Sequence, residues 1–178
     1  MRATTVVAAV ATMAYPFAVW LGLARFEPRW LALVLLALVL IRAGEMRSRR
    51  AVLFAGLGAM LLVAVTWLRN DALPLKLYPV VVNATLLAVF AASLARPPTV
   101  IERLARLTDP ALPAAAIPYV TRVTQVWCAF FVVNGAIALW TALAASDATW
   151  ALYNGAIAYV LIGALLLGER LVRPRHAH

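Results

Sequence analysis

The feature that most constrains this chain is a run of 27 residues, 119–145, in which most side chains are apolar. An α-helix rises ~1.5 Å per residue, so about 20 residues cross the ~30 Å hydrocarbon layer of a bilayer. The run is therefore long enough to cross with residues to spare. It also carries more polar groups than any other apolar segment, among them Arg122, Gln125, Cys128 and Asn134. We predict a transmembrane helix here, around which the other helices pack.

The composition extends this prediction to the whole chain. The 178 residues are 65% hydrophobic and 13% charged, whereas soluble domains average roughly 45–50% apolar and about 25% charged residues. We predict an all-α, multi-pass transmembrane helix bundle that forms a single domain over residues 1–178, with about six spans. They cover residues 4–24, 28–45, 51–68, 77–95, 119–145 and 150–167. The second has an apolar core of only residues 30–41, so it either crosses with flanking arginines reaching the interface or lies in the interface.

Residues 99–107 have the pattern of a short helix that does not cross. The sequence Thr-Val-Ile-Glu at 99–102 matches a capping box, which marks a helix start. Apolar side chains at positions 100, 101, 104 and 107 share one side, and Arg103 and Arg106 lie on the other. Nine residues are too few to cross a bilayer. We predict an amphipathic helix that lies in the headgroup layer.

The basic residues are unevenly divided between the two ends of the predicted spans. With the N-terminus in the cytoplasm, that side holds twelve of the 16 Lys and Arg, including the dense loop at 42–50. Short cytoplasmic loops of membrane proteins carry an excess of Lys and Arg. We therefore predict that both termini are cytoplasmic. We also expect residues 4–24 to be kept as a first span rather than cleaved as a signal peptide, because further spans follow at once.

Several classes of function find no support in the sequence. The net charge of +9 comes from short basic clusters between apolar segments, which favours contact with anionic lipids over a nucleic-acid face. The motifs CxxC, HExxH, GxSxG and a Walker-type glycine loop do not occur, and Cys128 is the single cysteine. His176 and His178 have no third ligand nearby, so no metal site is expected. We assign no catalytic residue, no cofactor and no nucleic-acid partner.

Arg122 is the strongest candidate for a functional residue. A charge inside the hydrocarbon layer is costly and usually marks a function, but an arginine one turn inside the interface can also simply extend to the phosphate layer. Gln125 lies at i+3 and shares a flank with Arg122. We expect both to face a polar groove open to the cytoplasmic leaflet, near the basic loop at 42–50. The same polar stripe also suits hydrogen bonds between helices.

Asn83, Asn134 and Asn154 complete the candidate groove, and each belongs to a different predicted span. Buried amide groups need hydrogen-bond partners. The three can meet in one hydrogen-bonded cluster, or each can bind a backbone carbonyl separately, and the second arrangement is slightly favoured. Trp127 lies deeper than the tryptophans at the span ends, so we expect it to pack inside the bundle.

Two groups of motifs resemble known membrane proteins. The stretch Trp-Cys-Ala-Phe-Phe at 127–131, with Gly135, a short turn, Trp150 and a final span, resembles the intracellular septation protein A family. The segments PPTVIER at 97–103 and YNG at 153–155 are more similar still to a sister group of small bacterial membrane proteins, often encoded among genes for aryl-polyene or pigment lipid synthesis. The resemblance covers about the last 110 residues, and the first 60 mainly by hydropathy.

This resemblance implies a protein of the bacterial inner membrane that is linked to envelope biogenesis and has no established catalytic residues. Our leading hypothesis is an interaction or lipid-handling component that supports cell-envelope or acyl-lipid assembly. Its expected partners are membrane lipids, including anionic headgroups, and membrane proteins of envelope synthesis. The alternative is a transporter or membrane enzyme for a lipid-like substrate, with Arg122 holding its anionic head.

Overall fold

The fold is entirely helical over the part of the chain that the structure describes. This structure, a computed structural model, describes residues 3–45 and 49–172, and the side chains of 10–41 and 56–172. No strand occurs in these ranges, so the all-α prediction is confirmed. The helices are α1 (Ala3–Leu23), α2 (Pro28–Glu45), α3 (Arg49–Arg69), α4 (Leu73–Lys76), α5 (Tyr78–Ala95), α6 (Val100–Thr108), α7 (Ile117–Ala144), α8 (Asp147–Leu152) and α9 (Ala158–Val172), with a 3₁₀ turn η1 (Ala114–Ala116) and a π-helix η2 (Tyr153–Ile157).

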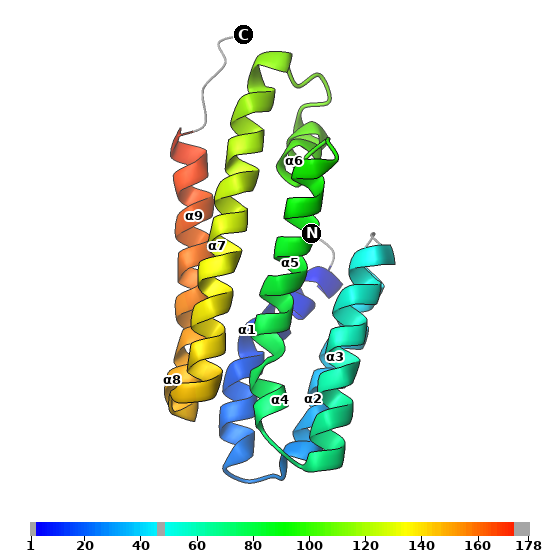
Figure 1. The fold of residues 1–178 in the computed structure, drawn as a ribbon, viewed down its shortest axis with the longest axis vertical. Helices are drawn as coiled ribbons and strands as arrows, with labels where there is room; N and C mark the ends of the chain where they lie inside the picture. Colours follow the sequence, from blue (N-terminus) through cyan, green and yellow to red (C-terminus); the bar gives the residue numbers. More distant parts are fainter. Residues whose placement is uncertain (1–2, 46–48, 173–178) are drawn as a thin grey trace.

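The long helices run alternately down and up in Figure 1. Helices α1, α3 and α7 descend in this view, and α2, α5 and α9 return. Helices α5, α7 and α9 extend further toward the upper end than α1 and α2, and α6 lies beside the top of α5. The most extensive helix pair is α5 with α7, followed by α2 with α3. The upper end of the molecule is therefore built mainly from the C-terminal half of the chain.

Three helical stretches are long and apolar enough to cross a membrane. They are Leu73–Ala95, Ala114–Ala144 and Asp147–Val172, each of which includes a short break or turn. Three shorter apolar helices, Val10–Leu23, Pro28–Ile41 and Gly56–Arg69, accompany them within the described side chains. These lengths are consistent with a membrane fold. The count of six spans, the crossing of residues 30–41 and the cytoplasmic termini stay predictions.

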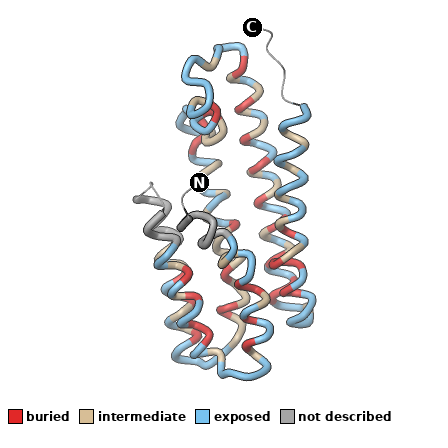
Figure 2. The backbone as a smooth tube through the Cα atoms, turned by 180° about the vertical axis from the view of Figure 1, so that it is seen from behind, coloured by how far each residue is buried: buried red, intermediate tan, exposed pale blue. Residues whose placement is uncertain are grey.

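Apolar side chains occupy both the interior and the outer surface. Buried positions recur along the helices, with exposed positions between them, as Figure 2 shows. Tyr15, Leu35 and Trp150 belong to one core cluster and are at most 2% exposed. By contrast, Leu68 is 84% exposed and Val160 is 70% exposed. Large exposed apolar patches are rare on soluble monomers, so this outer surface is suited to contact with lipid.

Helix α6 forms where the capping box predicts it. Thr99 is the N-cap, and its Oγ1 accepts a hydrogen bond from the backbone N–H of Glu102 at 3.2 Å. Arg106 donates to the Glu102 carboxylate at 2.9 Å, one helical turn away. Glu102 is buried, whereas Leu104 and Leu107 are exposed on the outer face of the helix. The helix is confirmed, and its position in the headgroup layer stays a prediction.

The predicted sixth span is interrupted near its start. Helix α8 passes into the π-helix η2 before α9 begins. Single-turn π-helices are rare and occur frequently at functional sites. Gly155 lies in this turn, and a Cβ at that position would overlap the ring of Phe17. Glycine therefore lets α1 pack directly against the irregular turn.

Candidate functional site

Two hollows adjoin α9. We call the first the central cavity; its volume is about 200 Å³, and it is bordered by α1, α5, α7 and the η2–α9 segment. We call the second the lateral groove; its volume is about 270 Å³, and it lies between α7 and α9. Asn83, Asn134 and Asn154 line the central cavity, whereas Arg122 lines the lateral groove. Gln125 is exposed and lines neither hollow.

The five residues that we expected in one polar groove are thus divided. Arg122 and Asn134 are twelve positions apart on the continuous helix α7. At ~1.5 Å per residue, about 18 Å of helix separates them, which is too far for one small ligand to touch both. The predicted nearness of Arg122 to the basic loop at 42–50 concerns side chains outside the described residues.

Asn83 and Asn134 form a direct hydrogen-bonded pair between α5 and α7. Asn134 Nδ2 donates to Asn83 Oδ1 at 3.0 Å, and Asn83 Nδ2 donates to the carbonyl oxygen of Pro79 at 2.8 Å. The Tyr153 hydroxyl donates to Asn134 Oδ1 at 2.9 Å. Gly135 allows this approach, because a Cβ there would lie 3.2 Å from the Cβ of Asn83. Two of the three asparagines therefore meet directly, and one of them also binds a backbone carbonyl.

Asn154 is held separately and keeps one acceptor atom unused. It lies in η2 and is 5% exposed. Its Nδ2 donates to the carbonyl oxygen of Trp150 at 2.9 Å and to Thr141 Oγ1 at 3.2 Å. No described residue donates a hydrogen bond to its Oδ1. Most buried side-chain polar atoms have a partner, so this oxygen is an unused acceptor on a residue that lines the central cavity.

The α5 wall of the central cavity begins at a helix break. One residue separates α4 from α5, and Pro79 has no N–H to donate to the carbonyl of Leu75. The Tyr15 hydroxyl donates to that carbonyl oxygen at 3.0 Å. Trp150 Nε1 donates to the carbonyl oxygen of Lys76, also at 3.0 Å. Side chains from α1 and α8 thus bind carbonyl groups at the break, as an apolar environment requires.

The described wall of the central cavity carries no charged side chain. Among the described residues that line it, none is Asp, Glu, Lys, Arg or His. Its polar groups are amides and hydroxyls, and its remaining wall is apolar or aromatic. The rings of Tyr15 and Tyr78 meet edge to face in this wall, with centroids 5.1 Å apart. Such a surface can hold an uncharged group that makes hydrogen bonds, but it offers no counter-charge to an ion.

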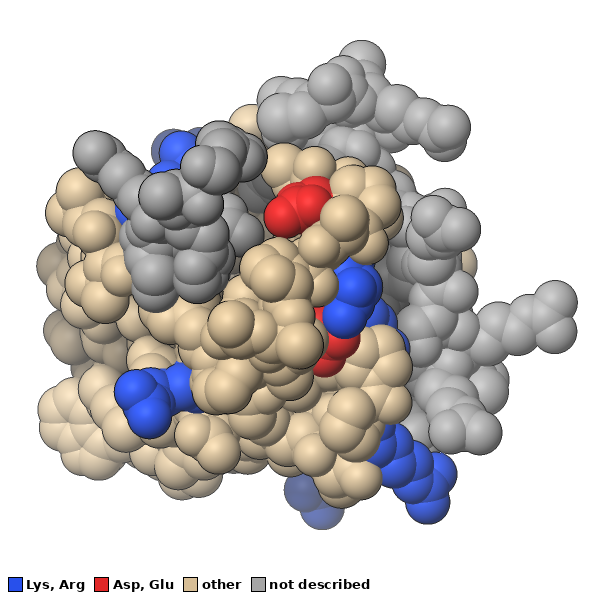
Figure 3. All heavy atoms as spheres, turned by 90° about the horizontal axis from the view of Figure 1, so that it is seen from above, with Lys and Arg blue, Asp and Glu red and all other residues tan. Residues whose placement is uncertain are grey.

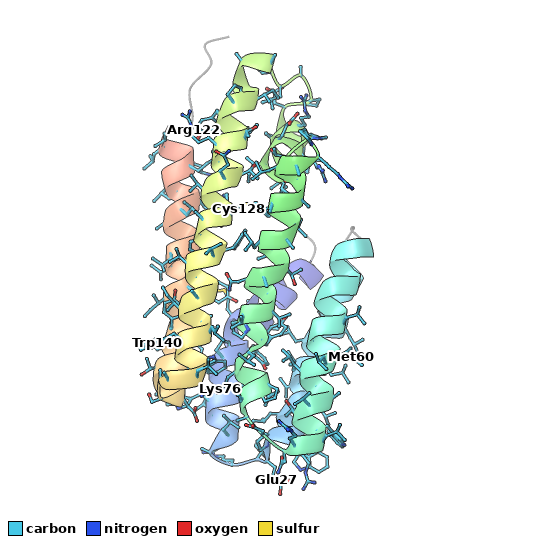
Figure 4. The ribbon with its side chains drawn as sticks, viewed as in Figure 1. Glu27, Met60, Lys76, Arg122, Cys128 and Trp140 are labelled. Carbon is cyan, nitrogen blue, oxygen red and sulfur yellow. The ribbon has the colours of Figure 1, made fainter. Side chains whose placement is uncertain are left out.

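The lateral groove combines an apolar wall with two charged side chains. Val123, Val126 and Ala164 belong to the wall, and Arg122 and Glu169 also line the groove. Figure 4 shows Arg122 beside the upper ends of α7 and α9. Arg122 is exposed, and no described residue forms an ion pair or hydrogen bond with it. Its guanidinium is therefore available to an anionic group outside the chain.

The charges at the upper end are scattered. Figure 3, which looks onto this end, shows basic side chains (blue) as separate groups with acidic side chains (red) among them. Arg103 Nε donates to the carbonyl oxygen of Pro98 at 2.8 Å, and Arg106 binds Glu102. Of the described arginines near this end, Arg122 is the one that lines the lateral groove. Among the described residues of the groove, Arg122 therefore supplies the positive charge.

Sequence reasoning missed several parts of these two hollows. Tyr153 and Thr141 bind the asparagines, and Glu169 lines the groove, but none of the three was a candidate. One signal for the irregular turn was present. Asn and Gly both disfavour helix interiors, and they are adjacent at 154–155 within an apolar run.

The aromatic motif behind the family resemblance forms an internal cluster. Trp127 is 7% exposed, and its ring centroid lies 5.6 Å from that of Phe131 and 6.4 Å from that of Phe90. The prediction that Trp127 packs inside the bundle is confirmed. No family model matches this chain, and neither a curated protein nor a solved structure matches it. The resemblance to the septation family therefore stays a prediction from the motifs.

Proposed function

We propose that this protein is a lipid-handling component of the bacterial inner membrane that supports cell-envelope or acyl-lipid assembly. The observation that supports this most directly is the lateral groove, where Arg122 adjoins an apolar wall between α7 and α9. A phospholipid combines apolar acyl chains with an anionic phosphate. The groove offers a matching surface to each of these parts.

The position of Arg122 along α7 favours contact with a headgroup. It lies five residues after Ile117, the first residue of a helix 28 residues long. About 20 residues are enough to cross the hydrocarbon layer, so the first turns of such a helix reach the headgroup level. At that depth a guanidinium can bind phosphate through two parallel hydrogen bonds. An acyl chain can then run along the apolar wall toward the middle of the bundle.

Helix α6 gives independent support for lipid at this end. Leu104 is 54% exposed and Leu107 is 78% exposed, on a helix that also carries Arg103 and Arg106. An amphipathic helix with exposed leucines and nearby arginines is suited to the boundary between headgroups and acyl chains. It lies beside α5 and α7, so the same boundary would meet the upper part of the lateral groove.

The alternative function, a transporter or membrane enzyme for a lipid-like anionic substrate, has less support. A route for an anion through the middle of the bundle would pass the central cavity. The described residues that line this cavity include no cation. A charged headgroup there would lose its hydration without gaining a partner. We therefore propose that the phosphate of the lipid binds at Arg122, in the lateral groove, and not in the central cavity.

Lipid mass spectrometry on gently purified protein tests this function. We expect a copurifying phospholipid whose amount falls about tenfold in Arg122→Gln, because hydrogen bonds to charged groups contribute ~1.5–3 kcal/mol. Arg122→Lys should retain an intermediate amount, since lysine cannot make the two-pronged contact with phosphate. The matched control is Arg170→Gln, because Arg170 is exposed on α9 but does not line the groove.

A second variant tests the apolar part of the same site. Ala164→Leu places a larger side chain in the groove and should also lower the amount of bound phospholipid. Equal amounts of lipid in the parent, Arg122→Gln and Ala164→Leu, at normal protein levels, would contradict the proposal. Copurification of envelope-synthesis membrane proteins from the same gentle preparation tests the proposed partners.

A further inference from the structure

We propose that the central cavity binds a small uncharged molecule with a hydroxyl group, an alcohol or a phenol, which donates a hydrogen bond to Oδ1 of Asn154. This site is separate from the lateral groove, so the inference goes beyond the proposed function and does not depend on it. The hydroxyl can belong to a free small molecule or to the polar end of a neutral lipid. The chemistry at Asn154 is the same for both sources.

The unused acceptor of Asn154 carries this inference. The residue is 5% exposed, and its Nδ2 is fully occupied by the Trp150 carbonyl and Thr141 Oγ1. These two bonds fix the amide so that Oδ1 is the end without a described partner. A buried acceptor without a donor is costly. A ligand that fits this atom must therefore donate a hydrogen bond, which a hydroxyl does and an ether or ketone does not.

The rest of the wall sets the charge and the size of the ligand. The described lining residues carry no charge, so an ammonium or a carboxylate would be left without a counter-ion. Tyr78 and Phe131 contribute aromatic surface, and Leu86 and Ile162 contribute aliphatic surface. The volume of about 200 Å³ is below the ~300–1,000 Å³ of sites for drug-sized ligands. A single ring with a hydroxyl, or the hydroxyl-bearing end of a neutral lipid, fits these limits.

Helix irregularities on three elements adjoin this one cavity. Pro16 removes a backbone donor from α1, Pro79 lies in the first turn of α5, and Asn154 lies in the π-helix η2; all three residues line the cavity. Each irregularity costs regular hydrogen bonds. In a membrane bundle, irregular backbone is tolerated where it lines a cavity. Because all three irregularities adjoin the same cavity, we infer that the cavity is a built feature of the fold and not a packing defect.

The test compares two pairs of probes in which O-methylation removes the hydroxyl donor. Phenol and its methyl ether, anisole, represent a free ligand, and a monoacylglycerol and its dimethyl ether represent a neutral lipid. Binding to the full-length protein in detergent is measured by the concentration dependence of the thermal unfolding midpoint. We expect the hydroxyl compound of at least one pair to bind about tenfold more tightly than its ether, the size of effect typical of one hydrogen bond.

Two substitutions on α9 locate the site. Ala158→Leu fills the central cavity and should remove the preference for the hydroxyl compound, whereas Ala164→Leu, in the lateral groove, should keep it. Both variants are measured in the same micelles, so a difference between hydroxyl compound and ether in their partitioning into the detergent affects both variants equally and cancels in the comparison. Asn154→Leu should also remove the preference. Asn154 holds Trp150 and Thr141, so if that variant does not fold, Ala158→Leu still provides the test.

The outcomes separate the two sources of the hydroxyl group. Selective binding of phenol indicates a free ligand, and selective binding of the monoacylglycerol alone indicates a lipid; either result supports the site. Equal binding of hydroxyl compound and ether in both pairs, or no binding at all, overturns the inference. A preference that persists unchanged in Ala158→Leu also overturns it, because the compound would then bind elsewhere.

Discussion

The central cavity and the lateral groove share one helix, yet they differ in the properties that decide what each can bind. Ala158 lines the cavity and Ala164 lines the groove. Six positions on an α-helix turn by ~240°, so the two alanines face different neighbours. On the side of Ala158, helix α9 borders a hollow with buried amides and hydroxyls, whereas on the side of Ala164 it borders an apolar wall with an exposed arginine and a carboxylate. The same helix therefore separates an uncharged site from a charged one.

The two hollows also differ in how far their side chains contribute to the stability of the bundle. The three asparagines around the cavity are buried and hydrogen-bonded to other parts of the bundle, so each contributes to the fold as well as to the site. Arg122 in the groove is exposed and without a described protein partner. Substitutions at the cavity should therefore change the free energy of unfolding, and substitutions at the charged side chains of the groove should change ligand binding alone.

The largest effect is expected for Trp150→Ala. Trp150 is 0% exposed and its Nε1 binds the carbonyl of Lys76 at the helix break. Loss of a buried tryptophan typically costs about 3–5 kcal/mol in the free energy of unfolding. The control is Trp140→Ala, because Trp140 is 60% exposed and a surface change should stay within about 0.5 kcal/mol. The free energy of unfolding of both variants is measured in mixed micelles. Equal losses in the two variants would contradict the prediction that the buried tryptophan contributes more to stability than the exposed one.

An intermediate effect is expected for Asn134→Ala. This change removes the bond to Asn83 and leaves the Tyr153 hydroxyl without its acceptor. Hydrogen bonds between helices in membranes contribute ~0.6 kcal/mol on average and up to about 1.7, so we expect a loss of about 1–2 kcal/mol. A double-mutant cycle with Asn83→Ala isolates the pair. Gln125→Ala, on the exposed face of the same helix, should change the free energy of unfolding little. A loss as large as that of Asn134→Ala would contradict the stabilising role of the Asn83–Asn134 pair.

The smallest effect is expected for Glu169→Gln, in the groove. Its carboxylate lines the same hollow as Arg122, so it should repel a net negative headgroup and favour a zwitterionic one. Removal of a partly exposed charge changes binding by up to ~1 kcal/mol, which corresponds to at most about fivefold. We expect Glu169→Gln to bind relatively more phosphatidylglycerol than phosphatidylethanolamine in native mass spectrometry, with unchanged stability. Glu27→Gln, at the opposite end of the molecule, should leave this preference unaltered.

The helical class, the apolar surface and the start of α6 could be predicted from the amino-acid sequence. These depend on local patterns: long apolar runs, and a threonine three residues before a glutamate. The depth of Trp127 also followed from its position within a long run, and the structure buries it. Even the separation of Arg122 from Asn134 was available, because twelve positions on one helix fix a distance of about 18 Å. Grouping the two residues in one groove neglected that spacing.

Which polar groups meet depends on how the helices pack. Asn83 and Asn134 are 51 positions apart and pair because Gly135 lets α5 approach α7. Tyr15 reaches the carbonyl of Leu75 across 60 positions, a contact that no local pattern encodes. The rotation and register of each helix depend on the packing of all its neighbours at once. For that reason the sequence could name the asparagines, but the packing of the bundle places Asn154 in the wall of a cavity and leaves its Oδ1 without a described donor.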